Sequence, residues 1–132
     1  MKNIIFLILI IIIANACSSD IKMSGSQSQK AYIKLFVHPK QGFKPLTVVM
    51  EAELINYQNE ENKFYCLLEE WDFGDGNKSY YQPDCKEGDK IKTKYIATHT
   101  YYNPGTYRIQ LTLGKNVIRS QSARVNVYSS GI

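Results

Sequence analysis

The sequence lacks the features that would indicate a nucleic-acid-binding or fibrous protein. Its 132 residues contain 16 Lys plus Arg against 12 Asp plus Glu, with no lysine and arginine run and no basic helical stripe. This composition argues against a nucleic-acid partner. The 8 Gly and 4 Pro show no period, which excludes the collagen-like and low-complexity classes.

Groups that carry enzymatic chemistry are also scarce. Only 2 His are present and no CxxC occurs, which argues against a zinc site, a Ser-His-Asp triad and redox chemistry. Glu69 and Glu70 are neighbours, and neighbouring residues on a strand point to opposite faces. We expect these two residues, and the pair Glu51 and Glu53, to lie on solvated faces. The sequence therefore predicts no enzymatic activity and no cofactor.

The amino-terminal residues have the layout of a secretory signal peptide. Lys2 precedes an unbroken apolar stretch from Ile4 to Ala14, and small residues then lead to Cys17. The stretch is shorter than the about 20 residues that a membrane-spanning helix needs. Residues 1–16 are therefore predicted to be a signal peptide that is removed.

The segment Ala14-Asn15-Ala16-Cys17 resembles the lipobox of bacterial lipoproteins, with Ala14 where that family more often has Leu. The resemblance implies that Cys17 is acylated and becomes the first residue of the mature chain. Lipidation would leave Cys66 and Cys85 as an even pair for a structural disulfide in an oxidising compartment. A secreted protein with a free thiol at Cys17 is the alternative.

Lipidation also implies a location. Acylation with two or three chains anchors a protein stably, so we expect a bacterial cell-envelope protein that faces the periplasm or the exterior. Ser18 replaces the Asp that retains some lipoproteins at the inner membrane, which favours the outer membrane where one exists. Residues 17–30 are rich in Ser, Gln and Gly and are predicted to be a flexible tether.

Residues 31–128 predict one all-β domain, followed by a short tail at 129–132. Apolar and polar residues alternate, and no stretch sustains a helical spacing. The predicted strands include 32–37, 46–54, about 64–73, 106–113 and one that reaches Val127, with a turn region at 38–45 and a polar loop at 56–62. About seven short strands separated by regular turn signals are typical of an immunoglobulin-like β-sandwich.

Three motifs occur in a fixed order: Trp71-Asp72-Phe73-Gly74-Asp75-Gly76, His99-Thr100-Tyr101 and Pro104-Gly105-Thr106-Tyr107. Together with Pro45-Leu46-Thr47-Val48, this set resembles the PKD (polycystic kidney disease) domain over roughly residues 31–128. The resemblance implies a seven-stranded sandwich that serves as an extracellular, non-enzymatic module for protein or carbohydrate interaction.

The motif residues also have a direct physical interpretation. Trp71 and Phe73 share a strand face and are expected in the core. Asp72, Asp75 and the glycines favour a tight turn, and Pro104-Gly105 resembles the central pair of a type II turn. A calcium site at Asp72 and Asp75 is the alternative to turn stabilisation, because calcium prefers oxygen ligands.

The chain departs from the family pattern in the segment 77–98, which is about ten residues longer than usual and carries Cys85. Tyrosines and lysines gather in and around it, and the candidate binding surface comprises Tyr80, Tyr81, Lys90, Lys92 and Tyr95. Exposed tyrosines beside cations are typical of contact surfaces, although cross-strand packing explains them equally well. A second departure is Glu69, where the family often has an aromatic residue.

These observations predict a lipid-anchored cell-envelope protein whose sandwich domain binds an envelope protein or glycan. The alternative is a periplasmic inhibitor, or an accessory subunit of an envelope enzyme or secretion complex, that uses the insertion as its docking loop.

Overall fold

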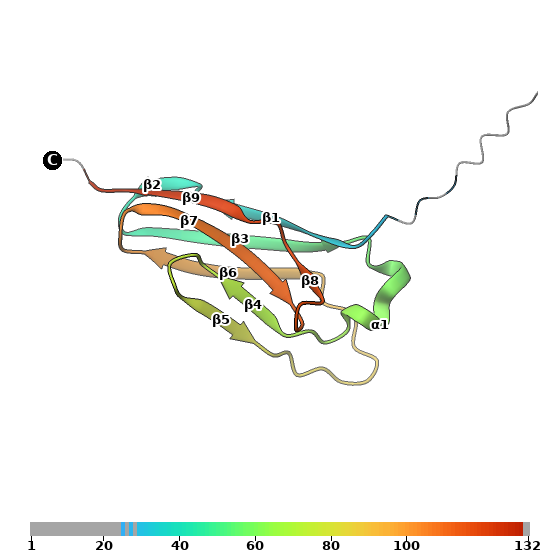
Figure 1. Ribbon diagram of the computed structural model, residues 1–132. Coiled ribbons are helices and arrows are strands. Elements are labelled where there is room, and N and C mark those ends of the chain that lie inside the picture. Colours follow the sequence, from blue (N-terminus) through green and yellow to red (C-terminus); the bar gives the residue numbers. More distant parts are fainter. Residues whose placement is uncertain (1–24, 26, 28, 131–132) are drawn as a thin grey trace, which may run out of the picture.

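The computed structural model describes residues 25, 27 and 29–130, which form a two-layered β-sandwich (Figure 1). The strands are β1 (Tyr32–His38), β2 (Gln41–Phe43), β3 (Leu46–Ile55), β4 (Glu69–Asp72), β5 (Lys78–Tyr81), β6 (Lys94–Tyr101), β7 (Gly105–Leu113), β8 (Ile118–Arg119) and β9 (Ala123–Tyr128). Two short helical turns, η1 (Gln58–Glu60) and α1 (Glu61–Phe64), follow β3.

Several sequence predictions fall outside this description. The signal peptide, Cys17 and most of the tether at 17–30 are not among the described residues, and neither are the last two residues of the tail. Within the described part of the chain, no helix is long and apolar enough to cross a membrane.

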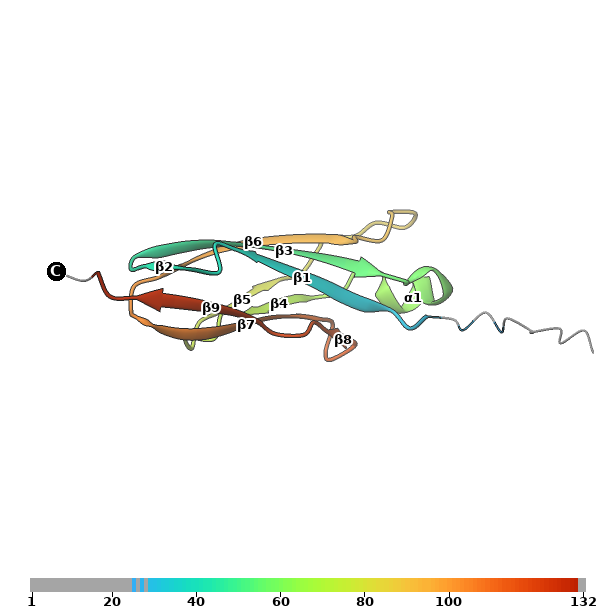
Figure 2. The same ribbon diagram turned by 90° about the horizontal axis from the view of Figure 1, so that it is seen from above.

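The strands divide into two sheets. One sheet has the order β1-β3-β6, and the other has the order β2-β9-β7-β4-β5 with β8 paired on β7. Viewed from above, β3 and β6 lie along one side of the sandwich and β7 and β9 along the other (Figure 2). All strand pairs are antiparallel except that of β2 with β9. The fold is thus the predicted immunoglobulin-like sandwich.

The core forms where the inward-facing residues of the two sheets meet. The predicted alternation along β3 is confirmed, because Val48, Met50, Ala52 and Leu54 are all buried. Trp71 and Phe73 are buried as well, with 3% and 5% of their surfaces exposed. The other sheet contributes Ile109, Leu111, Leu113, Val125 and Val127. Full burial of each large apolar side chain contributes about 1.5–3 kcal/mol to stability.

Two segments differ from their predicted structure. Residues 41–43, expected within a turn region, form β2 and pair in parallel with Gln41 opposite Asn126 of β9. The strand expected from about residue 64 begins only at Glu69, because Phe64 ends α1 and Cys66 has a left-handed backbone with φ of 52°. The predicted polar loop before it contains η1 and α1.

The Pro104-Gly105 prediction was also wrong in its geometry. A type II turn needs a positive φ at its second central residue, whereas Gly105 has no such angle and opens β7 opposite Val127. Glycine fits here for a different reason. A Cβ on Gly105 would lie 3.2 Å from the ring of Tyr107, so the site favours a residue without a side chain.

Candidate functional site

The turn between β4 and β5 is built by its two aspartates. Asp72 Oδ1 accepts a hydrogen bond from the backbone N–H of Gly74 at 2.9 Å, and Asp75 Oδ1 accepts one from the N–H of Asn77 at 3.0 Å. Gly74 and Gly76 supply positive φ angles of 80° and 92°. Because each carboxylate satisfies a backbone donor, both aspartates stabilise the turn directly.

His99 ties this turn to the opposite sheet. Its Nε2 lies 2.7 Å from Asp75 Oδ2, and its ring stacks on Phe73 with centroids 4.1 Å apart. Burial of the Asp75 carboxyl raises its pKa, but hydrogen bonds from His99 and Asn77 outweigh that effect and lower the pKa below its ordinary value of 3.8. The ionised carboxylate is therefore the form that the fold stabilises.

Tyr101 and Tyr107 complete the motif cluster. The Tyr101 hydroxyl donates to the backbone carbonyl of Phe73 at 2.7 Å, and the two tyrosine rings stack with centroids 4.3 Å apart. Burial raises the pKa of Tyr101. The Tyr107 hydroxyl donates to the carbonyl of Asn103. The three motifs are thus joined to one another by hydrogen bonds and stacked rings at one end of the sandwich, and these contacts stabilise the fold.

The calcium alternative gains no support from the surroundings of these aspartates. The Asp75 carboxylate is hydrogen-bonded to the side chains of His99 and Asn77, and the Asp72 carboxylate lies 3.5 Å from the Lys78 ammonium. Over the described ranges, no group of three or more His, Cys, Asp or Glu side chains is placed to hold a metal ion.

The insertion at 77–98 is fastened to the end of the sandwich. The predicted disulfide is confirmed, since Cys66 and Cys85 are bonded with their Cα atoms 5.9 Å apart. The Tyr65 hydroxyl donates to the backbone carbonyl of Lys86, and the Gln82 amide donates to that of Cys66. A covalent link and two hydrogen bonds therefore fix the loop to the segment that follows α1.

Glu69 corrects a prediction about this region. It was expected on a solvated face, but only 4% of its surface is exposed. Its carboxylate forms an ion pair with the Lys92 ammonium, which also lies 5.3 Å from the Tyr81 ring centroid and 5.0 Å from that of Tyr95. The burial of Glu69 is compensated by a cation from the insertion, so this residue is a further anchor for the loop.

Tyr95 also differs from its prediction as a surface residue. It is 3% exposed, and its hydroxyl donates to the Lys92 backbone carbonyl at 2.6 Å. Burial and the nearby negative charge of Glu69 raise its pKa to about 12. Tyr95 therefore packs in the core, and it does not belong to the predicted contact surface.

The other members of the predicted surface are accessible. Tyr80 and Tyr81 are 61% and 56% exposed on the edge strand β5. Lys90 is exposed on the insertion, and the Lys92 side chain is 45% exposed. Tyr80 and Tyr81 point to opposite faces of β5, because side chains alternate along a strand. Tyr81 shares its face with the Lys92 cluster.

A groove next to the insertion was missed by sequence reasoning. It has a volume of about 540 Å³ and lies between the helical turns and the loop, where Tyr57, Asn62 and Tyr65 approach Asp89 and Lys90. The polar sequence around residue 57 gave no sign of it, because the two walls come from separate segments that the Cys66–Cys85 bond and the hydrogen bonds beside it hold together. Aromatic rings beside amide and charged groups are suited to polar ligands.

Comparison with known families agrees with the motif evidence. A family model described as the PKD domain matches residues 46–128, which is more than half of the chain. No curated protein matches the sequence.

Proposed function

The chain belongs to the PKD domain family, and from this premise we propose that it is a non-enzymatic, lipid-anchored protein of a bacterial cell envelope that binds a protein or glycan partner. The family suggests an extracellular domain of the adhesion or binding type. The lipobox-like segment ending at Cys17 supports the anchor. The outer membrane is the proposed site in a cell that has one.

One observation carries the binding proposal. Tyr80 and Tyr81 are exposed on an edge strand next to a loop that is held by the Cys66–Cys85 disulfide and by the Lys92–Glu69 ion pair. A fixed loop loses little conformational entropy on binding. Tyrosine offers a large amphipathic contact area at low entropic cost. We call Tyr81, Lys90 and Lys92, together with Tyr80 on the other face of the same edge strand, the tyrosine-lysine surface.

The test compares matched tyrosine variants. Wild type, Tyr80→Ser with Tyr81→Ser, and the control Tyr102→Ser are assayed for retention on purified cell-wall glycan and for crosslinking to envelope proteins in intact cells. Tyr102 is a suitable control because it is 71% exposed outside this surface. We expect the double variant to lose about tenfold or more in affinity while the control is unchanged. Equal behaviour of all three proteins would reject the proposed surface.

A second candidate function rests on the same fixed loop. A disulfide-held loop that projects from a small sandwich also suits an inhibitor, or an accessory subunit of an envelope enzyme or secretion complex. Crosslinking through Lys90 to an envelope hydrolase whose activity falls on addition of the protein would favour this alternative. Retention on purified glycan would favour the first proposal.

A further inference from the structure

The charges of the described residues are segregated along the chain. Every Asp and Glu among them lies between Glu51 and Asp89, whereas residues 29–50 and 90–130 contain lysines and arginines but no carboxylate side chain. The first of these ranges forms β1 and β2, and the second forms β6 to β9. Because β3 with Glu51 and Glu53 lies between β1 and β6, the cationic part of the sandwich is the side formed by β8 and β9, although the net charge of the whole chain is small.

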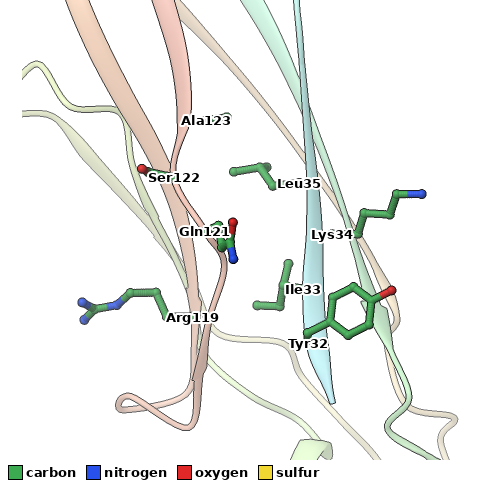
Figure 3. Close-up of a pocket in the computed structure, with 8 residues that line it drawn as sticks. All are labelled: Tyr32, Ile33, Lys34, Leu35, Arg119, Gln121, Ser122 and Ala123. Atoms are coloured by element: carbon green, nitrogen blue, oxygen red, sulfur yellow. The ribbon is translucent and has the colours of Figure 1, made fainter. Parts of the chain in front are cut away.

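An open groove lies beside this cationic part, between the edges of the two sheets. It separates β1 from the segment between Arg119 and Arg124, and it has a volume of about 640 Å³ with a smaller continuation of about 250 Å³. Figure 3 shows Ile33 and Leu35 pointing from β1 toward the opposite segment, with Lys34 and Arg119 on the two outer rims. We call this opening the β1–β9 groove.

The β1 side of the groove is an unpaired strand edge. The N–H of Leu54 donates to Thr93, toward β6, so the backbone groups of Leu54 face away from its β1 partner Ile33. Hydrogen-bonded and non-hydrogen-bonded pairs alternate along an antiparallel ladder. The backbone N–H and C=O groups of Ile33, Leu35 and Val37 therefore face away from β3, and in the described part of the chain β1 pairs with β3 alone.

On the opposite side of the groove, β9 also has backbone groups that no strand pairs with in the described part of the chain. The N–H of Asn126 donates to the carbonyl of Lys40, and residues two apart on a strand direct their backbone groups to the same side. The backbone groups of Arg124 therefore also face the groove. Beyond this point β2 pairs with β9 at Asn126–Tyr128. The chain thus adds its own three-residue strand to this edge and leaves the rest open.

The two arginines on the β9 side of the groove form no ion pair with a carboxylate among the described residues, whereas Lys34 lies opposite Glu53 in the β1–β3 ladder. Arg119 donates to Thr112 and Asn116, which are neutral, and the Lys34 ammonium lies 4.9 Å from the Phe36 ring centroid. Arg124 lies directly opposite Arg108 in the β7–β9 ladder. Like charges in directly opposed positions are unfavourable, so a nearby anion would be stabilising.

We propose that the β1–β9 groove binds an extended acidic segment of a partner protein. The segment adds as a strand to the free edge of β1, so that its apolar side chains cover Leu35 while its carboxylates approach Arg119 and Arg124, which line the β9 side. A peptide fits better than a phosphate polymer or a lipid headgroup, because only a peptide offers both the donors and the acceptors that a strand edge lacks. This site is separate from the tyrosine-lysine surface and does not depend on it.

The test uses the full chain and a short blocked peptide that alternates glutamate with valine and threonine. Binding is measured by calorimetry, and amide hydrogen exchange is followed at Ile33, Leu35 and Val37. We expect slower exchange at these three amides and an affinity that falls about tenfold or more in Arg119→Glu with Arg124→Glu. Lys86→Glu, an equal change of charge per site at an exposed residue outside both the groove and the tyrosine-lysine surface, should bind as wild type does.

A second probe separates strand addition from simple charge attraction. The same peptide with N-methyl groups on alternate backbone nitrogens keeps its charges but cannot complete a ladder, and it should lose binding. The proposal is overturned if the methylated peptide binds equally, if the exchange rates do not change, or if Lys86→Glu weakens binding as much as the double variant. It is also overturned if polyphosphate or phosphatidylglycerol vesicles bind instead of the peptide. None of these outcomes bears on the tyrosine variants, so the two proposals fail separately.

Discussion

Gly74 and Gly76 stand two residues apart in one turn, but only Gly74 has backbone packed against it. A Cβ on Gly74 would lie 2.5 Å from the Arg108 carbonyl oxygen, whereas a Cβ on Gly76 would meet nothing within 4 Å. Both residues have positive φ, so alanine costs about 1–2 kcal/mol at either position. Gly74→Ala must also displace β7 and should lose more than about 3 kcal/mol. Urea unfolding of the two variants checks this order, and equal losses would contradict it.

The Asp75–His99 contact predicts a specific loss of stability in acid. The folded state lowers the pKa of Asp75 below its ordinary 3.8, so the unfolded state binds a proton first as the pH falls. The contribution of this carboxylate to stability is therefore complete above pH 3.8 and disappears as the pH drops through the lower folded value. Asp75→Asn should have a flatter profile of unfolding free energy between about pH 5 and pH 2. Parallel profiles for the variant and wild type would refute the prediction.

At the scale of elements, the insertion depends on its covalent anchor. The Cys66–Cys85 bond spans a sequence separation of 19, and a loop of this length predicts a contribution of about 3 kcal/mol on the chain-entropy model. Replacing both cysteines with serine should cost about that much and should speed amide exchange between residues 82 and 93. Exchange in β3 and β6 should change only with global stability. If the double cysteine variant leaves exchange in the loop unchanged, the anchor is not the disulfide.

Tyr65→Phe, which removes one hydrogen bond to the loop, should lower the free energy of unfolding by about 1 kcal/mol.

Sequence reasoning succeeded for elements whose burial shows in local alternation. The period of two along residues 46–54 predicted the inward face of β3. The prediction succeeded because β3 is the central strand of its sheet, with one face on the core, so that its residues are alternately buried and outward-facing. Reasoning failed for β2, since its partner Asn126–Tyr128 lies more than eighty residues away and the pairing is parallel. It failed for α1 because a four-residue helix is too short to show a helical period.

The candidate site was less predictable than the fold for a related reason. The exposure of Tyr80 and Tyr81 follows from an edge strand, and the burial of Tyr95 follows from its place on the inward face of β6. Glu69 shares the inward face of Trp71, and its buried charge is compensated by Lys92. Lys92 reaches Glu69 from an insertion that the disulfide and the hydrogen bonds beside it hold against the sheet. A contact made by a long loop has no local signature, so a carboxylate whose cation comes from such a loop is assigned to solvent because of its charge, even where alternation places it on an inward face. The pairing of cysteines was the one sequence signal for this contact.

At the scale of the whole molecule, the lipobox-like segment predicts that Cys17 decides where the protein resides. Intact mass and detergent partitioning of native protein should show added acyl mass and entry into the detergent phase, and Cys17→Ala should be water-soluble. A thiol count under non-reducing denaturation should find none in wild type, because Cys66 and Cys85 are bonded to each other and Cys17 carries the lipid. A water-soluble wild type with one reactive thiol would reject the anchor. The confirmed disulfide makes this count decisive. Two of the 3 cysteines are bonded to each other, so any free thiol that is counted must belong to Cys17.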